Sequence, residues 1–203
     1  GLFRGESSFI DWREQSYPVW AQPADIYMSE CLGTNAAYYG VLKVMEDMAT
    51  VLGKKKDVKK YGQKAEALKK AINDNFWVEE DGYYASYLYG RQNLTRTQQS
   101  ETLGESFCVL FGIADEERAA KVISSMPVGE FGPPIFSPQI VSQPDYHNNG
   151  VWPYVTSFWG KAAAKVGNET ALMHALACNV RTASIYATNY ENYSFNTGNP
   201  YTT

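Results

Sequence analysis

The chain has 203 residues, of which 44% are hydrophobic and 20% charged, and its 18 basic and 22 acidic side chains give a formal net charge of −4. These values are typical of a globular protein that forms one domain or part of a larger one. They argue against a nucleic-acid partner, which would select a basic surface. No apolar stretch approaches the roughly 18 residues that span a bilayer.

Two amphipathic helices are predicted near the start of the chain. Residues 29–52 carry apolar side chains at three- and four-residue spacing, and Gly53 ends the run. A second apolar stripe extends over residues 57–76, and its opposite face carries lysines that we interpret as solvated surface. Because only residues 54–56 separate the two segments, we predict an antiparallel helical hairpin.

The middle of the chain alternates between helical and irregular patterns. Residues 82–89 alternate weakly and indicate a short β-structure. Helical patterns follow at 98–112 and 115–126, where Asp115 is a suitable N-cap. A long loop rich in Gly, Pro and Asn occupies residues 127–153, and a loop of this length in a compact domain is usually functional.

Two further helices are predicted at 154–166 and 168–184, and the tail from residue 186 is aromatic and polar without periodicity. The total is six helices in three consecutive hairpins. The three cysteines, Cys31, Cys108 and Cys178, all lie in segments predicted to be helical, and we expect them to be free and buried. No Cys or His spacing typical of a metal site occurs, so we expect no metal and no cofactor.

Aromatic residues make up 14% of the chain, with 15 Tyr and 5 Trp, and many lie beside Gly, Pro, Asn or Asp in predicted loops. An aromatic ring offers a flat apolar face, and Tyr and Trp add a polar edge. This combination suits the apolar faces of sugars. The alternative is that the same rings pack loops against the core.

The first segment that could carry chemistry is 5–20, which precedes the first long helix. It holds Asp11 between Ile10 and Trp12. Burial beside these apolar side chains would raise the pKa of the carboxyl group, as a general acid at neutral pH requires. The simpler interpretation is a surface acid beside a packing tryptophan.

Two more segments combine polar and aromatic side chains. Residues 146–153 hold His147, two asparagines and a tryptophan, which fit either a sugar subsite or an Asn-Gly turn before a helix that starts at Trp-Pro. Residues 189–198 surround Glu191 with aromatics and amides, and Glu191 is the only acid after Glu169.

The order of these segments resembles the six-hairpin glycosidases, in particular relatives of glycoside hydrolase family 63, trehalases and the glucosidase part of glycogen debranching enzymes. Residues 8–11, Ser-Phe-Ile-Asp, are similar to the element that carries the general acid in that superfamily, although they lack its common Gly. Residues 150–153 resemble its Gly-x-Val-Trp-Pro element. Residues 191–198 resemble the element whose Glu is the catalytic base, with Phe-Asn where Asn-Pro is usual.

The resemblance implies an all-α fold, an α/α-toroid of the six-hairpin type. Residues 1–203 would form one partial toroid domain, about half of the whole, without the N-terminal helices and the final helix of the family toroid. It also implies inverting hydrolysis of glycosidic bonds in α-linked oligo- or polysaccharides, with Asp11 as general acid and Glu191 as general base. Inversion requires the two carboxyl groups to lie roughly 6.5–9.5 Å apart. For substrate binding we expect Trp12, Arg13, Gln15, Trp20, Asn35, His147, Asn149 and Trp152.

Two other functions fit the sequence less well. A polysaccharide lyase on the same toroid could use Tyr146 and His147, but it would have no use for Glu191 and would need more cationic side chains. A non-catalytic helical domain could bind glycans or pack against a neighbour.

We expect the exposed inner faces of a half-toroid to be covered by a second copy of the chain or by the missing half. The compartment is not indicated, and a signal peptide before Gly1 would direct the protein to the periplasm or outside the cell.

Overall fold

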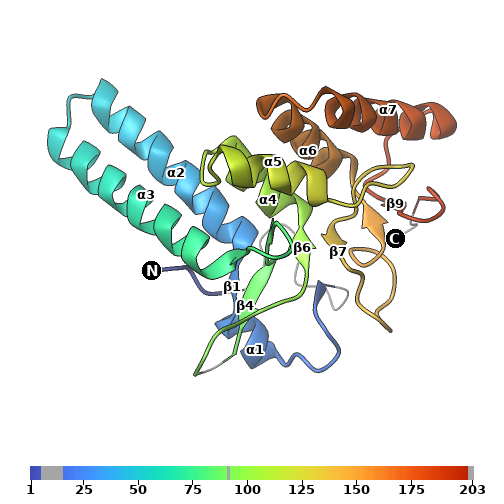
Figure 1. Cartoon of the computed structure of the whole chain (residues 1–203), viewed down its shortest axis with the longest axis horizontal. Helices are drawn as coiled ribbons and strands as arrows, with labels where there is room; N and C mark the ends of the chain where they lie inside the picture. The colour runs from blue at the N-terminus through green and yellow to red at the C-terminus, as the bar shows by residue number, and fades with distance from the viewer. Residues whose placement is uncertain (6–15, 91, 201–203) are drawn as a thin grey trace.

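Helices dominate the computed structural model, which describes residues 1–5, 16–90 and 92–200 (Figure 1). All six predicted helices are present, and they form three consecutive hairpins. Their bounds are α2 (Leu32–Val51), α3 (Lys55–Phe76), α4 (Thr102–Leu110), α5 (Glu116–Ser125), α6 (Pro153–Lys165) and α7 (Glu169–Tyr186). The expectation of an all-α fold that forms part of a toroid is confirmed.

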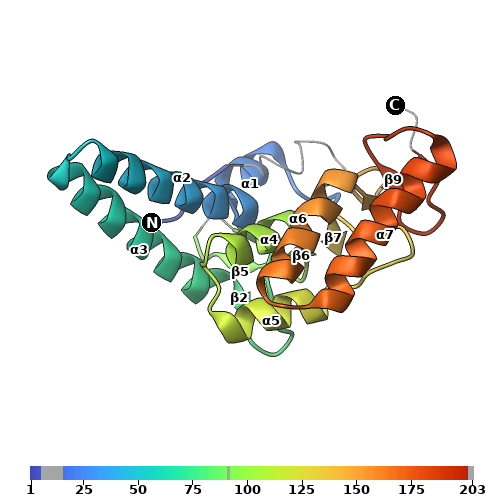
Figure 2. The same cartoon turned by 90° about the horizontal axis from the view of Figure 1, so that it is seen from above.

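The hairpins are arranged in two rows. Helices α2, α4 and α6 form the inner row, in which α4 packs between the other two. Helix α3 packs on α2, α7 packs on α6, and α5 contacts both α4 and α6. The α2–α3 hairpin therefore lies at one end of the molecule and the α6–α7 hairpin at the other (Figures 1 and 2).

Short antiparallel strands lie at the N-terminal ends of the inner helices, and we call this side of the molecule the strand face. Strands β1 (Glu30–Cys31), β6 (Ser100–Glu101) and β8 (Gly150–Val151) lead directly into, or end just before, α2, α4 and α6. Their partners are β4 (Tyr87–Tyr89), β7 (Phe136–Ser137) and β9 (Tyr193–Ser194), and β4 also pairs with β5 (Thr95–Arg96). Strands β2 (Trp77–Val78) and β3 (Tyr83–Tyr84) pair next to the C-terminus of α3.

Side-chain caps and proline set several helix ends. The Asp115 carboxylate accepts a hydrogen bond from the Arg118 backbone N–H at 2.9 Å, which confirms the predicted cap of α5. The Asn168 side chain caps α7 in the same way, through the Ala171 N–H at 3.0 Å. Pro153 is the first residue of α6, where its missing N–H costs no helical bond.

A seventh helix, α1 (Pro23–Met28), was not predicted. Its six residues complete fewer than two turns, so no apolar periodicity can be recognised. The signal that exists is local: proline opens the helix, and the Gln22 backbone N–H donates to the Asp25 carboxylate at 3.2 Å.

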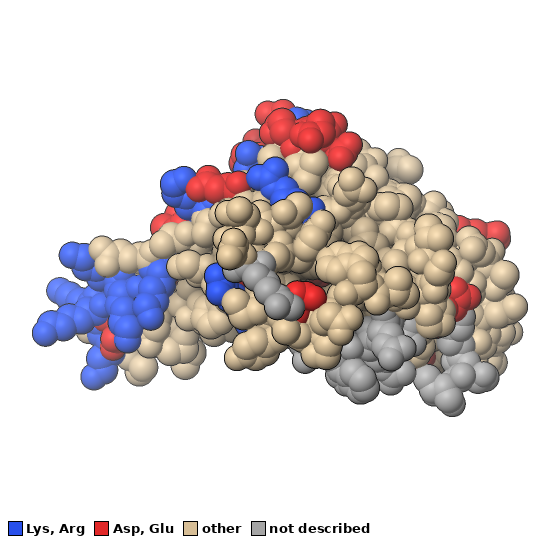
Figure 3. Space-filling model, turned by 90° about the horizontal axis from the view of Figure 1, so that it is seen from below, with Lys and Arg blue, Asp and Glu red and all other residues tan. Residues whose placement is uncertain are grey.

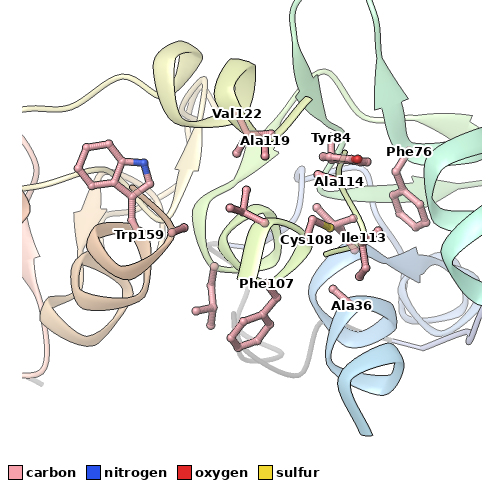
Figure 4. Packing of buried hydrophobic residues seen from close by; sticks show 14 of the residues in the cluster. Ala36, Phe76, Tyr84, Phe107, Cys108, Ile113, Ala114, Ala119, Val122 and Trp159 are labelled. Atoms are coloured by element: carbon pink, nitrogen blue, oxygen red, sulfur yellow. The ribbon is translucent and has the colours of Figure 1, made fainter. Parts of the chain in front are cut away.

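The core is built around α4, where buried side chains from the inner and outer helices meet. Figure 4 shows Ala36 of α2, Phe76 of α3 and Ala119 of α5 around the buried Phe107 and Cys108 of α4. The three cysteines are buried and none of them forms a disulfide, but Cys31 lies in β1 and not in a helix.

The outward faces of the two end helices expose large apolar side chains. Each of the following is at least half exposed: Val41, Val44, Met48 and Val51 of α2, and Met173, Leu176, Val180 and Ile185 of α7. Such contiguous apolar faces are rarely left to water on a monomer. None of the helices in the described ranges is long and apolar enough to cross a membrane.

Charged side chains are unevenly distributed. Figure 3 looks at the strand face and shows Lys and Arg gathered at the end formed by the α2–α3 hairpin, with Asp and Glu concentrated elsewhere. The lysines of α3 are on its solvent side, opposite the buried stripe Ala65, Leu68, Ile72 and Phe76. Much of the remaining surface in this view is uncharged.

Candidate functional site

Strands β8 and β9 bring two of the three candidate segments together. Gly150 pairs with Ser194 and Val151 with Tyr193, so the tail after α7 lies alongside the end of the long loop. The Phe195 backbone N–H also donates to the Asn149 carbonyl oxygen at 2.8 Å. This ladder positions Glu191, two residues before β9, next to the segment that contains Tyr146 and Trp152.

The contact between these segments is centred on Glu191. The Tyr146 hydroxyl donates a hydrogen bond to Oε2 of Glu191 at 3.0 Å. The Tyr146 ring itself is buried, whereas the Glu191 side chain reaches solvent. A carboxylate that is oriented by one donor and open to water on another side can accept a proton from a water molecule, which is the task of a general base.

Aromatic rings form one wall beside this carboxylate. The His147 and Trp152 rings are stacked with centroids 5.1 Å apart, and Tyr146 meets both of them edge-on. Trp152 also contacts Tyr154 at 5.9 Å. The indole N–H of Trp152 is buried and has no hydrogen-bond partner in the described part of the chain, so it is a donor that a ligand could satisfy.

The third candidate segment reaches the same place through the residues that follow it. The Ser16 hydroxyl and Nδ1 of His147 are 2.9 Å apart, and the Gln143 side chain donates to the Tyr17 carbonyl oxygen at 2.7 Å. The end of the segment 5–20 is therefore fixed against the long loop. Asp11, Trp12, Arg13 and Gln15 lie outside the described residues, so their predicted roles stay predictions.

The other predicted binding residues are distributed as follows. Trp20 is 52% exposed on the strand face, and Asn149 is half-buried beside the β8–β9 ladder. His147 and Trp152 are buried, at 1% and 7% exposure.

Asn35, which was predicted to bind substrate, lies in the interior of the protein. It is fully buried, its amide donates to the carbonyl oxygens of Cys31 and Phe3, and its Oδ1 accepts from the Phe3 backbone N–H at 2.8 Å. These bonds attach the N-terminal segment to α2. The sequence did not reveal this because Phe3 is 32 positions away.

Two buried carboxyl groups at the start of α4 were missed. Glu101, the N-cap of α4, accepts a hydrogen bond from the Gly104 backbone N–H at 3.0 Å and another from the Gly33 N–H at the start of α2. Burial raises its pKa to about 7, although these two N–H donors oppose the increase. Glu105 accepts from the Tyr84 N–H at 2.8 Å, and burial, with a smaller effect of Glu101, raises its pKa well above the usual range.

The negative charge of Glu101 also affects the pKa of Tyr154, a residue that is affected by Glu191 as well. The pKa of Tyr154, at the start of α6, is raised to about 12 by partial burial first, and then by the negative charges of Glu101 and Glu191. Tyr154 is 40% exposed and so connects the buried Glu101 region with the surface of the site. The N-termini of all three inner helices thus meet around acidic and aromatic side chains.

Comparisons with known proteins agree with this architecture. Residues 12–203 match the family model of the mannosylglycerate hydrolase MGH1-like glycoside hydrolase domain. No curated protein sequence matches the chain.

Among solved structures, neutral trehalase Nth1 from Saccharomyces cerevisiae is similar with a TM-score of 0.70 at 14% identity, over 88% of this chain and 36% of that one. A sialidase is similar with a TM-score of 0.72 at 17% identity, over 98% of this chain and 19% of that one. At such identities the likeness shows the fold, and the chain spans well under half the length of either protein. The match of the family model over nearly the whole chain shows that it belongs to the MGH1-like glycoside hydrolase domain family.

Proposed function

We propose that this chain carries the acid–base pair of an inverting glycoside hydrolase that acts on α-linked sugars, with Glu191 as general base and Asp11 as general acid. The observation that carries the proposal is the contact at the β8–β9 ladder, where Tyr146 orients a solvent-accessible Glu191 among aromatic rings. Membership of a glycoside hydrolase family supports the same reaction class.

In this proposal Glu191 removes a proton from a water molecule that attacks the anomeric carbon. Asp11 donates a proton to the departing glycosidic oxygen from the opposite side of the sugar ring. The Trp152 indole N–H supplies a hydrogen-bond donor, and exposed aromatic faces such as Trp20 bind sugar rings. Trp12, Arg13, Gln15 and Asn149 are proposed to contact sugar hydroxyls.

We also propose that residues 1–203 form one domain that is part of a larger toroid. The apolar faces of α2 and α7 lie at opposite ends of the inner and outer rows, where a closed ring would continue. Further helices, from the same protein or from a second copy, would cover them. A clean monomer of this chain in light scattering, stable and without any additional segment, would count against this part of the proposal.

The central test measures hydrolysis by the full-length gene product on a panel that includes mannosylglycerate and trehalose. Asp11→Asn and Glu191→Gln should each lower kcat by ~10²–10⁴-fold, because each removes one proton-transfer step. Glu130→Gln is the matched control, since Glu130 is an exposed acid that pairs with Arg181 and has no part in the proposed proton transfers. Proton NMR at early times should show the product with inverted anomeric configuration.

Retained activity in Glu191→Gln would refute the assignment of the base. Retained activity in Asp11→Asn together with loss in Glu14→Gln would show that another acid of the segment 5–20 is the proton donor. An unsaturated product that depends on Tyr146 and not on Glu191 would establish the lyase instead.

A further inference from the structure

A groove on the strand face lies beside the Glu191 site and has an accessible volume of about 370 Å³. Its lining comes from three parts of the chain: the segment before α1 with Trp20, strands β4 and β5 with the residues after them, and the chain that follows β7. This volume falls within the roughly 300–1,000 Å³ of small-molecule sites in proteins.

Aromatic rings form one wall of the groove. Trp20 is 52% exposed, and its ring centroid lies 5.3 Å from that of the half-buried Tyr89. Tyr89 lies 6.1 Å from Tyr87, which in turn contacts Tyr17 at 5.7 Å. Tyr17 and Tyr87 are buried in a small cluster with Cys31. The exposed ring is therefore held on a packed base, and it can offer a flat apolar face with little loss of side-chain entropy.

Amide side chains form the other wall. Gln99 donates to the Pro138 carbonyl oxygen at 2.9 Å, and Gln139 donates to the Phe136 carbonyl oxygen at 2.8 Å. These bonds fix two side-chain amides at the edge of the groove, where amides and hydroxyls can exchange hydrogen bonds.

Among the described residues that line the groove, Arg96 carries the only charge. Its guanidinium group is already engaged by the carbonyl oxygens of Asn75, at 2.6 Å, and Asp74, at 3.1 Å. An anionic ligand in the groove would therefore have to compete with these two carbonyl oxygens for the Arg96 guanidinium group. An uncharged ligand with an apolar face and several hydroxyls fits the lining better.

Hydrogen bonds connect the groove to the candidate site. Gln139 accepts a hydrogen bond from the Asn149 backbone N–H, and Asn148 bonds both backbone groups of Ile140, at 2.8 and 3.1 Å. Asn148 and Asn149 belong to the loop that also presents Tyr146 to Glu191. The groove wall and the loop of the Glu191 site are therefore one hydrogen-bonded unit.

We infer that this groove is a second sugar subsite, which binds an uncharged pyranose unit of an oligosaccharide at a distance from the bond that is cut. One ring face would stack on Trp20 and Tyr89, and its hydroxyls would bond the side chains of Gln99 and Gln139. The choice of a carbohydrate rests on the proposed function, but the groove binds its sugar without any help from Glu191 or Asp11.

The test is isothermal titration calorimetry of the chain with maltopentaose and mannopentaose, each compared with the corresponding disaccharide. We expect the pentasaccharide to bind more tightly than the disaccharide, and Trp20→Ala to weaken only pentasaccharide binding, by about tenfold, equal to 1.4 kcal/mol. Tyr27→Ala is the matched control, because Tyr27 of α1 is 74% exposed and outside the groove lining. Circular dichroism checks that each variant folds.

The outcomes separate the subsite from the proposed reaction. If Glu191→Gln abolishes hydrolysis while Trp20→Ala leaves pentasaccharide affinity unchanged, the groove inference and the binding role of Trp20 are wrong, and the assignment of Glu191 as general base stands. If pentasaccharide binding depends on Trp20 although no hydrolysis can be detected, the subsite stands without the enzyme. If neither pentasaccharide binds, or if Tyr27→Ala weakens binding as much as Trp20→Ala, the subsite is refuted.

Discussion

The buried carboxyl group of Glu101 predicts an unusual dependence of stability on pH. Its pKa is about 7 in the folded chain, against an ordinary value of 4.5 that applies when the chain unfolds. The folded state therefore holds this proton more tightly than the unfolded state does. The stabilisation is fully present below pH 4.5 and is lost as the pH rises towards and through 7.

The magnitude follows from the two pKa values. At 1.36 kcal/mol for each pH unit, the difference between about 7 and 4.5 corresponds to a loss of about 3 kcal/mol of unfolding free energy. This is a large part of the stability of a typical domain. Because Glu105 lies one turn away and its pKa is also raised, the native chain should lose somewhat more than Glu101 alone predicts.

Urea unfolding at pH 5.0 and pH 8.0 measures this effect. Between these two pH values Glu101 alone should cost the chain about 2.5 kcal/mol of unfolding free energy, and Glu101→Gln should lose about 2.5 kcal/mol less than the native chain, because its side chain does not titrate. The variant is expected to be weakened at both pH values, since a side-chain amide replaces the carboxyl group that accepts hydrogen bonds from the Gly33 and Gly104 N–H groups. Glu130→Gln serves as an exposed control. Equal pH dependence in Glu101→Gln and the native chain would refute the reasoning.

Two further variants test contacts described above. Asn35→Ala should lower the unfolding free energy by roughly 2–3 kcal/mol, because it leaves buried backbone groups unpaired, whereas the exposed Asn196→Ala should change it little in the same urea titration. Tyr146→Phe should lower kcat about tenfold with an unchanged KM and circular dichroism spectrum, because it removes the donor that orients Glu191. An unchanged kcat would show that Glu191 needs no such partner.

The helices could be predicted from the sequence because each has a stripe of apolar residues. Helix α3 is the clearest example, since its buried positions Ala65, Leu68, Ile72 and Phe76 recur at helical spacing and its lysines face water. Apart from the β-structure predicted over residues 82–89, the short strands could not be predicted, because pairs such as Gly150 with Ser194 depend on contacts between distant parts of the chain. The same holds for the short α1.

The candidate site was only partly predictable. The sequence indicated that the segments around Trp152 and Glu191 carry chemistry, and the structure brings them into contact. It did not indicate that Glu101 is buried, because a glutamate before a helix is usually solvated. Burial arises here because Gly33 and Gly104, which lack side chains, allow the starts of α2 and α4 to approach: a Cβ at Gly104 would lie 2.9 Å from the Gly33 nitrogen.

The return of the tail onto β8 makes the α6–α7 hairpin a closed loop of chain. Strand β8 precedes α6, β9 follows α7, and the two strands pair with each other. Glu191 is held in place only while β8 and β9 are paired. Any local opening that separates β9 from β8 therefore also moves the Glu191 carboxylate away from Tyr146. Small openings of this kind cost less free energy than global unfolding. If Glu191 is the general base, as proposed, activity would be lost on heating before the core around α4 melts, and hydrogen exchange in β9 would measure how often this opening occurs.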